Sequence, residues 1–276
     1  MMYGYGNMIS PTNRLFGGGG GGGAYTARTT AFATATGITD TTILGALNDF
    51  DLGLISNSLD TKMKAVYPFV GTTATTQKFN FMDSRDLDIA FRLQFNGGGT
   101  FSSNGYLPNG TNAYANTYYN QTTQGDSLSS GHLSYYSRSN TGASGINIGT
   151  QQTAGVIKYN FLNIGNSASY YYPNSIGGTN FPDTDYRGFY LGNRNSLTNI
   201  NFWKSGIKKV EISSFTNYGN INVNIFIGAM SNNGSPSNYS TKECAFASIG
   251  LGLTDTEAST FYNLVQAMQT SLSRQV

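Results

Sequence analysis

Short runs of alternating apolar and polar residues recur along this chain of 276 residues, and they restrict its fold more than any other feature. Successive side chains of a β-strand point to opposite faces, so a period of two predicts half-buried strands. Clusters rich in Gly, Asn and Ser, which favour turns, separate the runs. Many short strands joined by such turns predict a mainly β protein in which two sheets stack as a sandwich.

Three of these runs define the expected strands most clearly. Each places apolar residues at every second position, so that these residues share one face of a strand. The shared faces are Ile89, Phe91, Leu93 and Phe95 in residues 87–95; Ile157, Tyr159 and Phe161 in residues 156–162; and Ile221, Val223, Ile225 and Ile227 in residues 221–228. Residues 201–212 are expected to form a hairpin with Ser205 and Gly206 at its tip, because Gly after a polar residue suits a two-residue turn.

The amino-terminal part of the chain has a different composition. Its seven consecutive glycines have no side chains to bury, and their backbones lose the most freedom on ordering. The tract serves either as a flexible linker or as a segment ordered by close packing against neighbouring chains. In both cases we expect residues 1–30 to form an assembly arm. The glycines are Gly17, Gly18, Gly19, Gly20, Gly21, Gly22 and Gly23.

A short helix is expected after the arm, within a helical connector at residues 31–61. Thr39 is available as its N-cap residue. Two glycines inside the segment weaken this helix, since each costs about 1 kcal/mol relative to Ala, so it should need tertiary contacts. The apolar residues at helical spacing are Ile43, Leu47, Phe50 and Leu54.

The rest of the chain, residues 62–276, is expected to be the sandwich, ending in a helix at residues 254–272. Thr254 and Glu257 match a capping box, in which both side chains bind free backbone donors of the first helical turn. We expect this helix to cover an edge or face of the sandwich or to contact another subunit. Its apolar stripe is Ala258, Phe261, Val265, Met268 and Leu272.

The composition argues against several classes of function. Charged residues make up 11% of the chain and the net charge is +2, so no strong field is available to attract nucleic acid. The single cysteine, Cys244, has no partner for a disulfide within the chain and fits a buried strand position better than a nucleophile. We find neither the pattern of a secretory signal nor an apolar run long enough to span a membrane.

Three segments, "GFYLGNRNSLTNINFWKSG", "NVNIFIGAM" and "ECAFASIGLGLTDTEASTFYNLV", look like the end of a concanavalin A-like, laminin-G-type jelly-roll module. The closing residues 245–276 look more specifically like the carboxy terminus of virion structural proteins of tailed bacteriophages. Residues 61–115 resemble the earlier part of those same proteins. This resemblance, over about half of the chain, implies a two-sheet jelly roll exposed on a virus particle as a fibre, tail, baseplate or capsid-decorating subunit.

No enzyme signature accompanies this resemblance. Related sandwiches that hydrolyse glycosides carry a Glu-x-Asp-x-Glu strand, whereas the three glutamates here, Glu211, Glu243 and Glu257, are far apart in sequence. We therefore assign no catalytic residue. His132, the one histidine, rules out a zinc site with several histidines and is expected to begin a strand.

Two aspartate pairs are candidate sites, since their i, i+2 spacing places both carboxylates on one side of a strand. They are Asp86 with Asp88, and Asp183 with Asp185. Capping, turn formation or binding to an Arg is the expected role, and calcium ligation, as in laminin-G-type modules, is the alternative. No complete ligand set is legible, so we expect no cofactor and no metal.

Clustered tyrosines are the strongest indication of binding. Tyr170, Tyr171 and Tyr172 lie in "SASYYYPN", which we interpret as an exposed loop. Packing inside the sandwich and at subunit contacts is the first interpretation of the clustered rings, and stacking on a glycan or contact with a receptor is the alternative. Similar clusters are Tyr118 with Tyr119 and Tyr135 with Tyr136.

Three hypotheses follow for the function. The first is a structural phage protein, made in the host cytoplasm and assembled with other virion proteins as a homo-oligomer, most simply a trimer. The second is an adhesin that recognises host glycans, which is compatible with the first. The third is a polysaccharide-degrading enzyme, which the missing carboxylate pattern disfavours.

Overall fold

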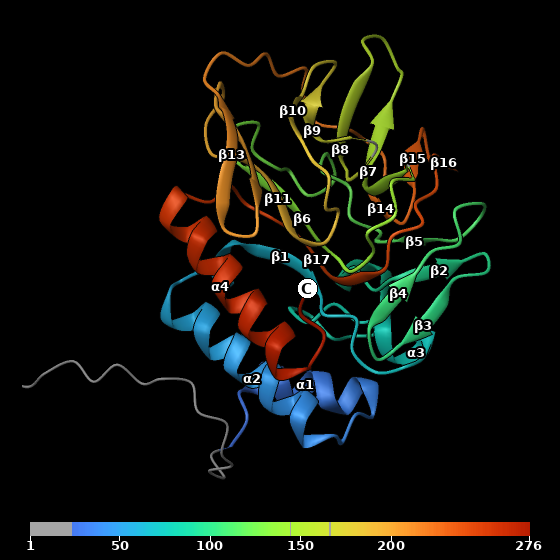
Figure 1. The fold of residues 1–276 in the computed structure, drawn as a ribbon, viewed down its shortest axis with the longest axis vertical. Helices are drawn as coiled ribbons and strands as arrows, with labels where there is room; N and C mark the ends of the chain where they lie inside the picture. Colours follow the sequence, from blue (N-terminus) through green and yellow to red (C-terminus); the bar gives the residue numbers. More distant parts are fainter. Residues whose placement is uncertain (1–23, 144, 166) are drawn as a thin grey trace, which may run out of the picture.

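The computed structural model describes residues 24–143, 145–165 and 167–276 and shows the predicted sandwich of two β-sheets, with helices packed on one side (Figure 1). Gly17–Gly23, assigned to an assembly arm, lie outside the described residues. The fold class inferred from the alternating runs is therefore confirmed, including a helix near the start and a helix at the end.

One sheet has eight strands and is antiparallel throughout. Its order is β13-β12-β11-β6-β17-β4-β3, with β1 pairing to β17. The strands are β1 (Met63–Tyr67), β3 (Thr100–Ser102), β4 (Gly105–Leu107), β6 (Gly131–Ser137), β11 (Gly188–Arg194), β12 (Ile200–Lys204), β13 (Ile207–Ile212) and β17 (Cys244–Gly250).

The other sheet has nine strands in the order β10-β9-β8-β7-β14-β5-β2, with β15 and β16 attached at β7. Its pairs are antiparallel except β15 with β7. The strands are β2 (Gln94–Asn96), β5 (Tyr114–Asn116), β7 (Ile146–Gln152), β8 (Lys158–Asn163), β9 (Ala168–Ser175), β10 (Thr179–Pro182), β14 (Phe226–Ile227), β15 (Met230–Asn232) and β16 (Ser235–Ser237).

A core of large apolar and aromatic side chains fills the space between the two sheets. Tyr171 of β9 crosses this space and packs against Phe202 of β12, with ring centroids 6.2 Å apart. Gly192 of β11 makes this approach feasible, because a Cβ atom there would lie 2.2 Å from the Tyr171 ring. Such close packing between the layers fixes their separation.

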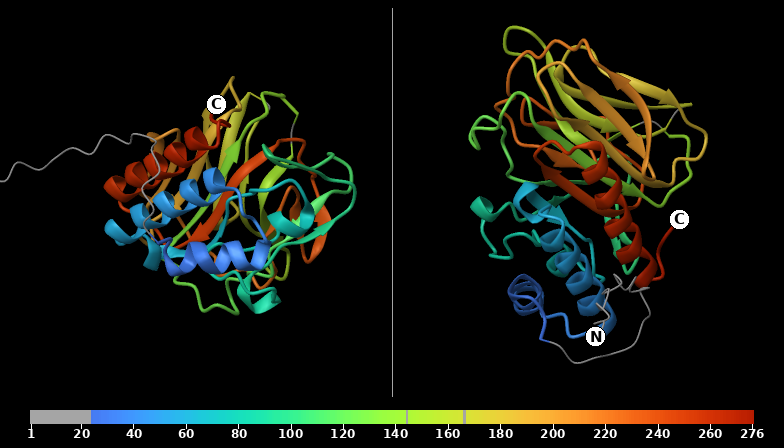
Figure 2. Two further views of the ribbon diagram at one scale, coloured as in Figure 1. Left: turned by 90° about the horizontal axis from the view of Figure 1, so that it is seen from below. Right: turned by 90° about the vertical axis from the view of Figure 1, so that its left-hand side faces the viewer.

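Helices cover the outer face of the eight-stranded sheet. Those described are α1 (Ala27–Thr36), α2 (Thr41–Ser56), α3 (Ala74–Gln77) and α4 (Asp255–Ser271), with 3₁₀ turns η1 (Asp60–Lys62) and η2 (Asp88–Ala90). Figure 2 shows α2 and α4 side by side against the sheet. Phe50 of α2 and Phe261 of α4 reach Phe246 and Phe189 of the sheet, forming a second apolar core.

The carboxy-terminal helix matches its prediction closely. Thr254 accepts a hydrogen bond from the Glu257 amide, and the Glu257 carboxylate accepts one from the Thr254 amide, as a capping box requires. Four residues of the expected stripe are buried, while Leu272 is the partly buried C-cap residue. The helix covers a face of the sandwich, which was one of the placements expected.

The first expected helix was placed correctly, but its cap was not. Its N-cap is Asp40 rather than Thr39, because the Asp40 carboxylate accepts hydrogen bonds from the amides of Thr42 and Ile43. The boundary expected at residue 30 falls inside α1, whose Arg28 forms an ion pair with the buried Asp51 of α2.

The strand expected at residues 87–95 is wrong over most of its length. Residues 88–90 form η2, Phe91 has a left-handed backbone (φ 60°), and only Gln94–Asn96 is a strand. Ile89 is 74% exposed. Arg92 binds the Asp86 and Asp88 carboxylates, and these ion pairs accompany a compact turn where the apolar alternation suggested extended backbone.

The strands predicted at residues 201–212 and 221–228 agree more closely with the structure. β12 and β13 form the expected hairpin, and Ser205 and Gly206 at its tip have positive φ angles of 47° and 76°. In residues 221–228 only Phe226–Ile227 is paired as a strand, although Ile221, Ile225 and Ile227 are buried as the alternation predicts.

Candidate functional site

The outer face of the nine-stranded sheet carries an aromatic cluster that no described helix covers. Tyr159 and Phe161 lie on β8, and Tyr172 lies opposite Phe161 on β9. The rings of Phe161 and Tyr172 are stacked, with centroids 4.6 Å apart. Tyr159 meets both rings edge-on at 5.7 Å. The three rings are each partly exposed and form one apolar surface.

A groove of about 400 Å³ follows this cluster. We call it the aromatic groove. Ile146 and Met230 are buried at its base, whereas Ile176 is 53% exposed. Among the described residues, no charged side chain lines it. The lining residues are Ile146, Gln151, Tyr159, Phe161, Tyr172, Ile176, Met230 and Asn238.

Two amide side chains supply polar groups to the aromatic groove. Gln151 lies at the end of β7, opposite Tyr159, and Asn238 follows β16. Within the described part of the chain, neither side-chain amide forms a hydrogen bond with another residue. Each can therefore donate to and accept from a ligand.

Tyr172 of the aromatic groove keeps its phenol proton at neutral pH. Burial is the main cause that raises the pKa of Tyr172 above its ordinary value, and the nearby Tyr170 and Tyr159 raise it further. A neutral hydroxyl can both donate and accept a hydrogen bond. The groove thus combines ring faces, phenol hydroxyls and side-chain amides, which suits an uncharged ligand with both apolar faces and hydroxyl groups.

The three tyrosines singled out in the sequence occupy different environments. The sequence predicted an exposed loop, but these residues lie in strand β9, where alternate side chains face opposite ways. Tyr172 lines the aromatic groove and Tyr170 lies on the same outer face. Tyr171 is 2% exposed and faces the core, so it has no surface to offer a ligand. Tyr119, Tyr135 and Tyr136 of the other clusters are also buried.

Sequence reasoning missed the contribution of β8 to this site. Residues 157, 159 and 161 were expected to share an apolar face, and they do, but for Tyr159 and Phe161 this is the outer face of the sheet. Leu162 and Ile164 face the core and are fully buried. Both alternations contain apolar residues, so a period of two does not tell which one points inward.

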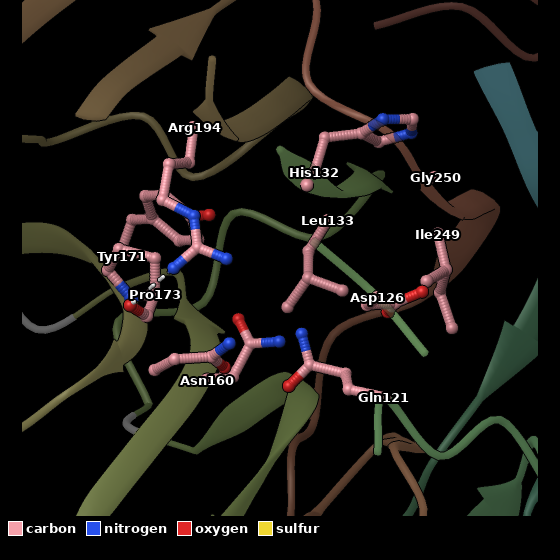
Figure 3. A pocket seen from close by; sticks show the side chains of 12 residues that line it. Gln121, Asp126, His132, Leu133, Asn160, Tyr171, Pro173, Arg194, Ile249 and Gly250 are labelled. Atoms are coloured by element: carbon pink, nitrogen blue, oxygen red, sulfur yellow. Dashed lines mark hydrogen bonds between the residues drawn. The ribbon is translucent and has the colours of Figure 1, made fainter. Parts of the chain in front are cut away.

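A second pocket lies inside the sandwich, between the ends of the two sheets (Figure 3). The Arg194 guanidinium points into it, opposite the side-chain amides of Gln121 and Asn160. Arg194 is 2% exposed and donates long hydrogen bonds to the carbonyls of Pro173 and Ser127. With a volume of about 10 Å³ the pocket accommodates a single water molecule and nothing larger.

The acidic residues considered for catalysis or calcium are bound to basic side chains. Asp86 contacts Lys78 and Arg92, and Asp185 contacts Arg187. The buried Asp183 accepts hydrogen bonds from Ser169, Tyr190 and Lys204. These contacts agree with the role in turns and ion pairs expected first.

None of the three glutamates lines the aromatic groove, and each lies beside a different basic side chain. Glu211 binds Lys208 and Glu257 binds Lys62. Glu243 lies 3.7 Å from Arg138. In the described residues no three side chains of His, Cys, Asp or Glu gather as they would around a metal ion.

Comparison with known proteins identifies similar folds but no family for this chain. No protein-family model and no curated protein matches the sequence. Among solved structures, one similar chain is the binding domain of botulinum neurotoxin DC in complex with rat synaptotagmin II, with 9% identity and a TM-score of 0.52 over 75% of this chain. Another is a mutant of HCR/D, with 9% identity and a TM-score of 0.51 over 75% of this chain.

These similarities are confined to the fold. The chain spans about half the length of the two solved structures, 52% and 53%. At such low identity the match supports a two-sheet β-sandwich and carries over no residue of a binding site. None of the described helices has the length and apolar character needed to cross a membrane.

Proposed function

We propose that this protein is a non-catalytic receptor-binding β-sandwich that recognises an uncharged glycan through the aromatic groove. The observation that carries the proposal is the stacked pair Phe161 and Tyr172, flanked by Tyr159 and by two side-chain amides that form no hydrogen bond with any other described residue. Sugars present apolar C–H faces to aromatic rings and hydroxyl groups to amides, so this combination suits them. The similarity in fold to a toxin's binding domain supports the proposal.

The proposed ligand is neutral because none of the described residues that line the aromatic groove is charged. A carboxylate or sulfate on the sugar would lose water there without gaining an ionic partner. Tyr170, two residues from Tyr172 on the same face, is proposed to extend the contact along β9. Tyr171 is no longer included, since it is buried in the core.

The proposal is tested with a glycan array followed by titration of the best ligand. Tyr172→Ala and Tyr159→Ala should each weaken binding at least about fivefold, since stacking on one ring is worth about 1 kcal/mol or more. Tyr25→Ala is the control, because Tyr25 is an exposed tyrosine beside α1, on the helical side. Unchanged affinity in both groove variants, or binding confined to acidic glycans, would contradict the proposal.

We also propose that the sandwich is displayed on a bacteriophage particle, as a homo-oligomer in contact with other virion proteins. Support comes from the resemblance of residues 61–115 and of the carboxy-terminal stretch to phage virion proteins with a concanavalin A-like jelly roll. The segments that carry it form the paired elements expected of such a module: the hairpin β12–β13, strand β17 and the capped helix α4. Proteomics and imaging of purified particles test this role, and absence of the protein from the particles would refute it.

A further inference from the structure

A groove runs between helices α2 and α4, which cover the outer face of the eight-stranded sheet, whereas the aromatic groove lies on the outer face of the nine-stranded sheet. We call it the helical groove. Phe50 of α2 and Met268 of α4 lie in it, together with Tyr262, Leu264 and the exposed Ala267. Its volume is about 470 Å³, and apolar atoms make up most of its surface. A groove of this size and character fits a few apolar side chains of a peptide.

The described chain starts beside this groove. The amide of Thr26 donates to the Asn48 side chain of α2 at 2.8 Å, which holds the start of α1 against α2. The next residue of α2, Asp49, lines the helical groove. The segment that precedes Thr26 therefore leaves from a point next to the groove.

The sequence before this point has matching properties. Leu15 and Phe16 form an apolar pair directly before the glycine tract, and Arg14 precedes them. Nine residues separate Phe16 from Thr26, and they span at most about 30 Å. α2 has 16 residues and is about 24 Å long. Leu15 and Phe16 can thus reach any part of the helical groove without strain in the tether.

Charge complementarity favours this occupant. Asp49 is exposed at the groove and has no basic side chain within 4.0 Å in the described part of the chain. Arg14, next to Leu15, can supply the missing positive charge when Leu15 and Phe16 occupy the apolar floor. A tether of this length also gives the segment an effective concentration of about millimolar, so that even weak contacts are populated.

We propose that Leu15 and Phe16 of the same chain dock into the helical groove, with Arg14 beside Asp49 and the glycine tract as the tether. The amino-terminal segment would then be held against its own sandwich until a competing surface displaces it. This inference concerns assembly and is independent of the proposed glycan binding.

The test is disulfide trapping in the full-length protein. Gly17→Cys with Ala267→Cys places one thiol beside the docking pair and one on the exposed wall of the groove. Gly17→Cys with Thr34→Cys is the matched control, since Thr34 is exposed on α1 and within reach of the same tether. The buried Cys244 should not interfere. We expect a disulfide within one chain that forms at least tenfold faster in the groove pair than in the control.

Two further variants connect the trapping to the proposed contacts. Adding Leu15→Ser and Phe16→Ser to the groove pair should slow its disulfide to the rate of the control, and Asp49→Lys should slow it several-fold. Equal rates in groove and control pairs, or no disulfide at all, would overturn the proposal. A disulfide between two chains would also overturn it, because the groove would then be filled by a second copy.

Discussion

His132 shows how the interior of the sandwich constrains a single side chain. It lies on β6, 2% exposed, with Nδ1 at 2.7 Å from the Leu251 carbonyl oxygen and Nε2 at 2.9 Å from Ser248 Oγ. Burial is the main cause that lowers the pKa of His132 to about 4; the Leu251 carbonyl opposes this shift, and Lys62 adds to it. The sequence correctly predicted its place in a strand but gave no hint of its environment.

The lowered pKa makes stability depend on pH in a definite direction. An unfolded histidine binds its proton below about pH 6.5, whereas the folded protein resists protonation until about pH 4. Between these values the unfolded state binds more protons, so the free energy of unfolding falls as the pH falls, by up to about 3 kcal/mol. Urea unfolding at several pH values measures this loss.

His132→Gln is the matched variant, because its amide can still reach polar partners but does not titrate. The chain has one histidine, so the difference in unfolding free energy between wild type and variant reports on this residue alone. We expect this difference to change with pH only between about 6.5 and 4. A difference that stays constant across this window would contradict the account.

The residues of the aromatic groove could not be predicted from the sequence, because the sequence does not show which face of β8 and β9 is buried. Tyr159, Phe161 and Tyr172 are residue types that also occur in the core. Leu162 and Ile164 are apolar as well, so the sequence is compatible with either face of β8 pointing inward. Which face is covered depends on the opposite sheet, whose strands come from distant parts of the sequence. Only the register of β8 against β7 and β9 resolves this choice.

At the scale of elements, the predictions were correct where an element depends on residues that are close in sequence. The capping box of α4 and the turn of the β12–β13 hairpin depend on residues close in sequence, and both form as predicted. The run at residues 87–95 failed because ion pairs of Arg92 with Asp86 and Asp88 accompany a turn there. The same turn also accepts hydrogen bonds from the Tyr67 hydroxyl at the Phe91 carbonyl and from the Asn80 amide at the Ala90 carbonyl, so its alternation was misleading.

The capping box leads to a prediction about α4. Thr254→Ala removes the oxygen that accepts from the Glu257 amide and should lower the free energy of unfolding by about 1 kcal/mol. Thr256→Ala is the control, since Thr256 is exposed in the first turn of the same helix and should change stability by less than about 0.5 kcal/mol. Urea unfolding compares the two. Equal losses in both variants would show that the cap does not stabilise the helix.

At the scale of the whole molecule, the two sheets have different outer surfaces. The eight-stranded sheet is covered by α2 and α4, with a second apolar core beneath them (Figure 1). The nine-stranded sheet keeps its aromatic groove open on the opposite side. The sandwich itself was predictable from alternation and turn composition, but this division was not, because it depends on which faces the helices cover.

This division supports the central claim that the outer face of the nine-stranded sheet is the binding surface. The helical layer stabilises the fold, whereas the groove residues Tyr159 and Tyr172 leave ring faces and hydroxyl groups partly exposed. Their substitution should therefore change binding much more than stability.

The most direct test is a crystal structure of the protein with the neutral oligosaccharide that binds best on a glycan array. The account predicts a sugar ring in contact with Tyr172 and Tyr159, with its hydroxyl groups bonded to Gln151 or Asn238. A sugar bound elsewhere on the molecule, with the aromatic groove occupied only by solvent, would contradict it.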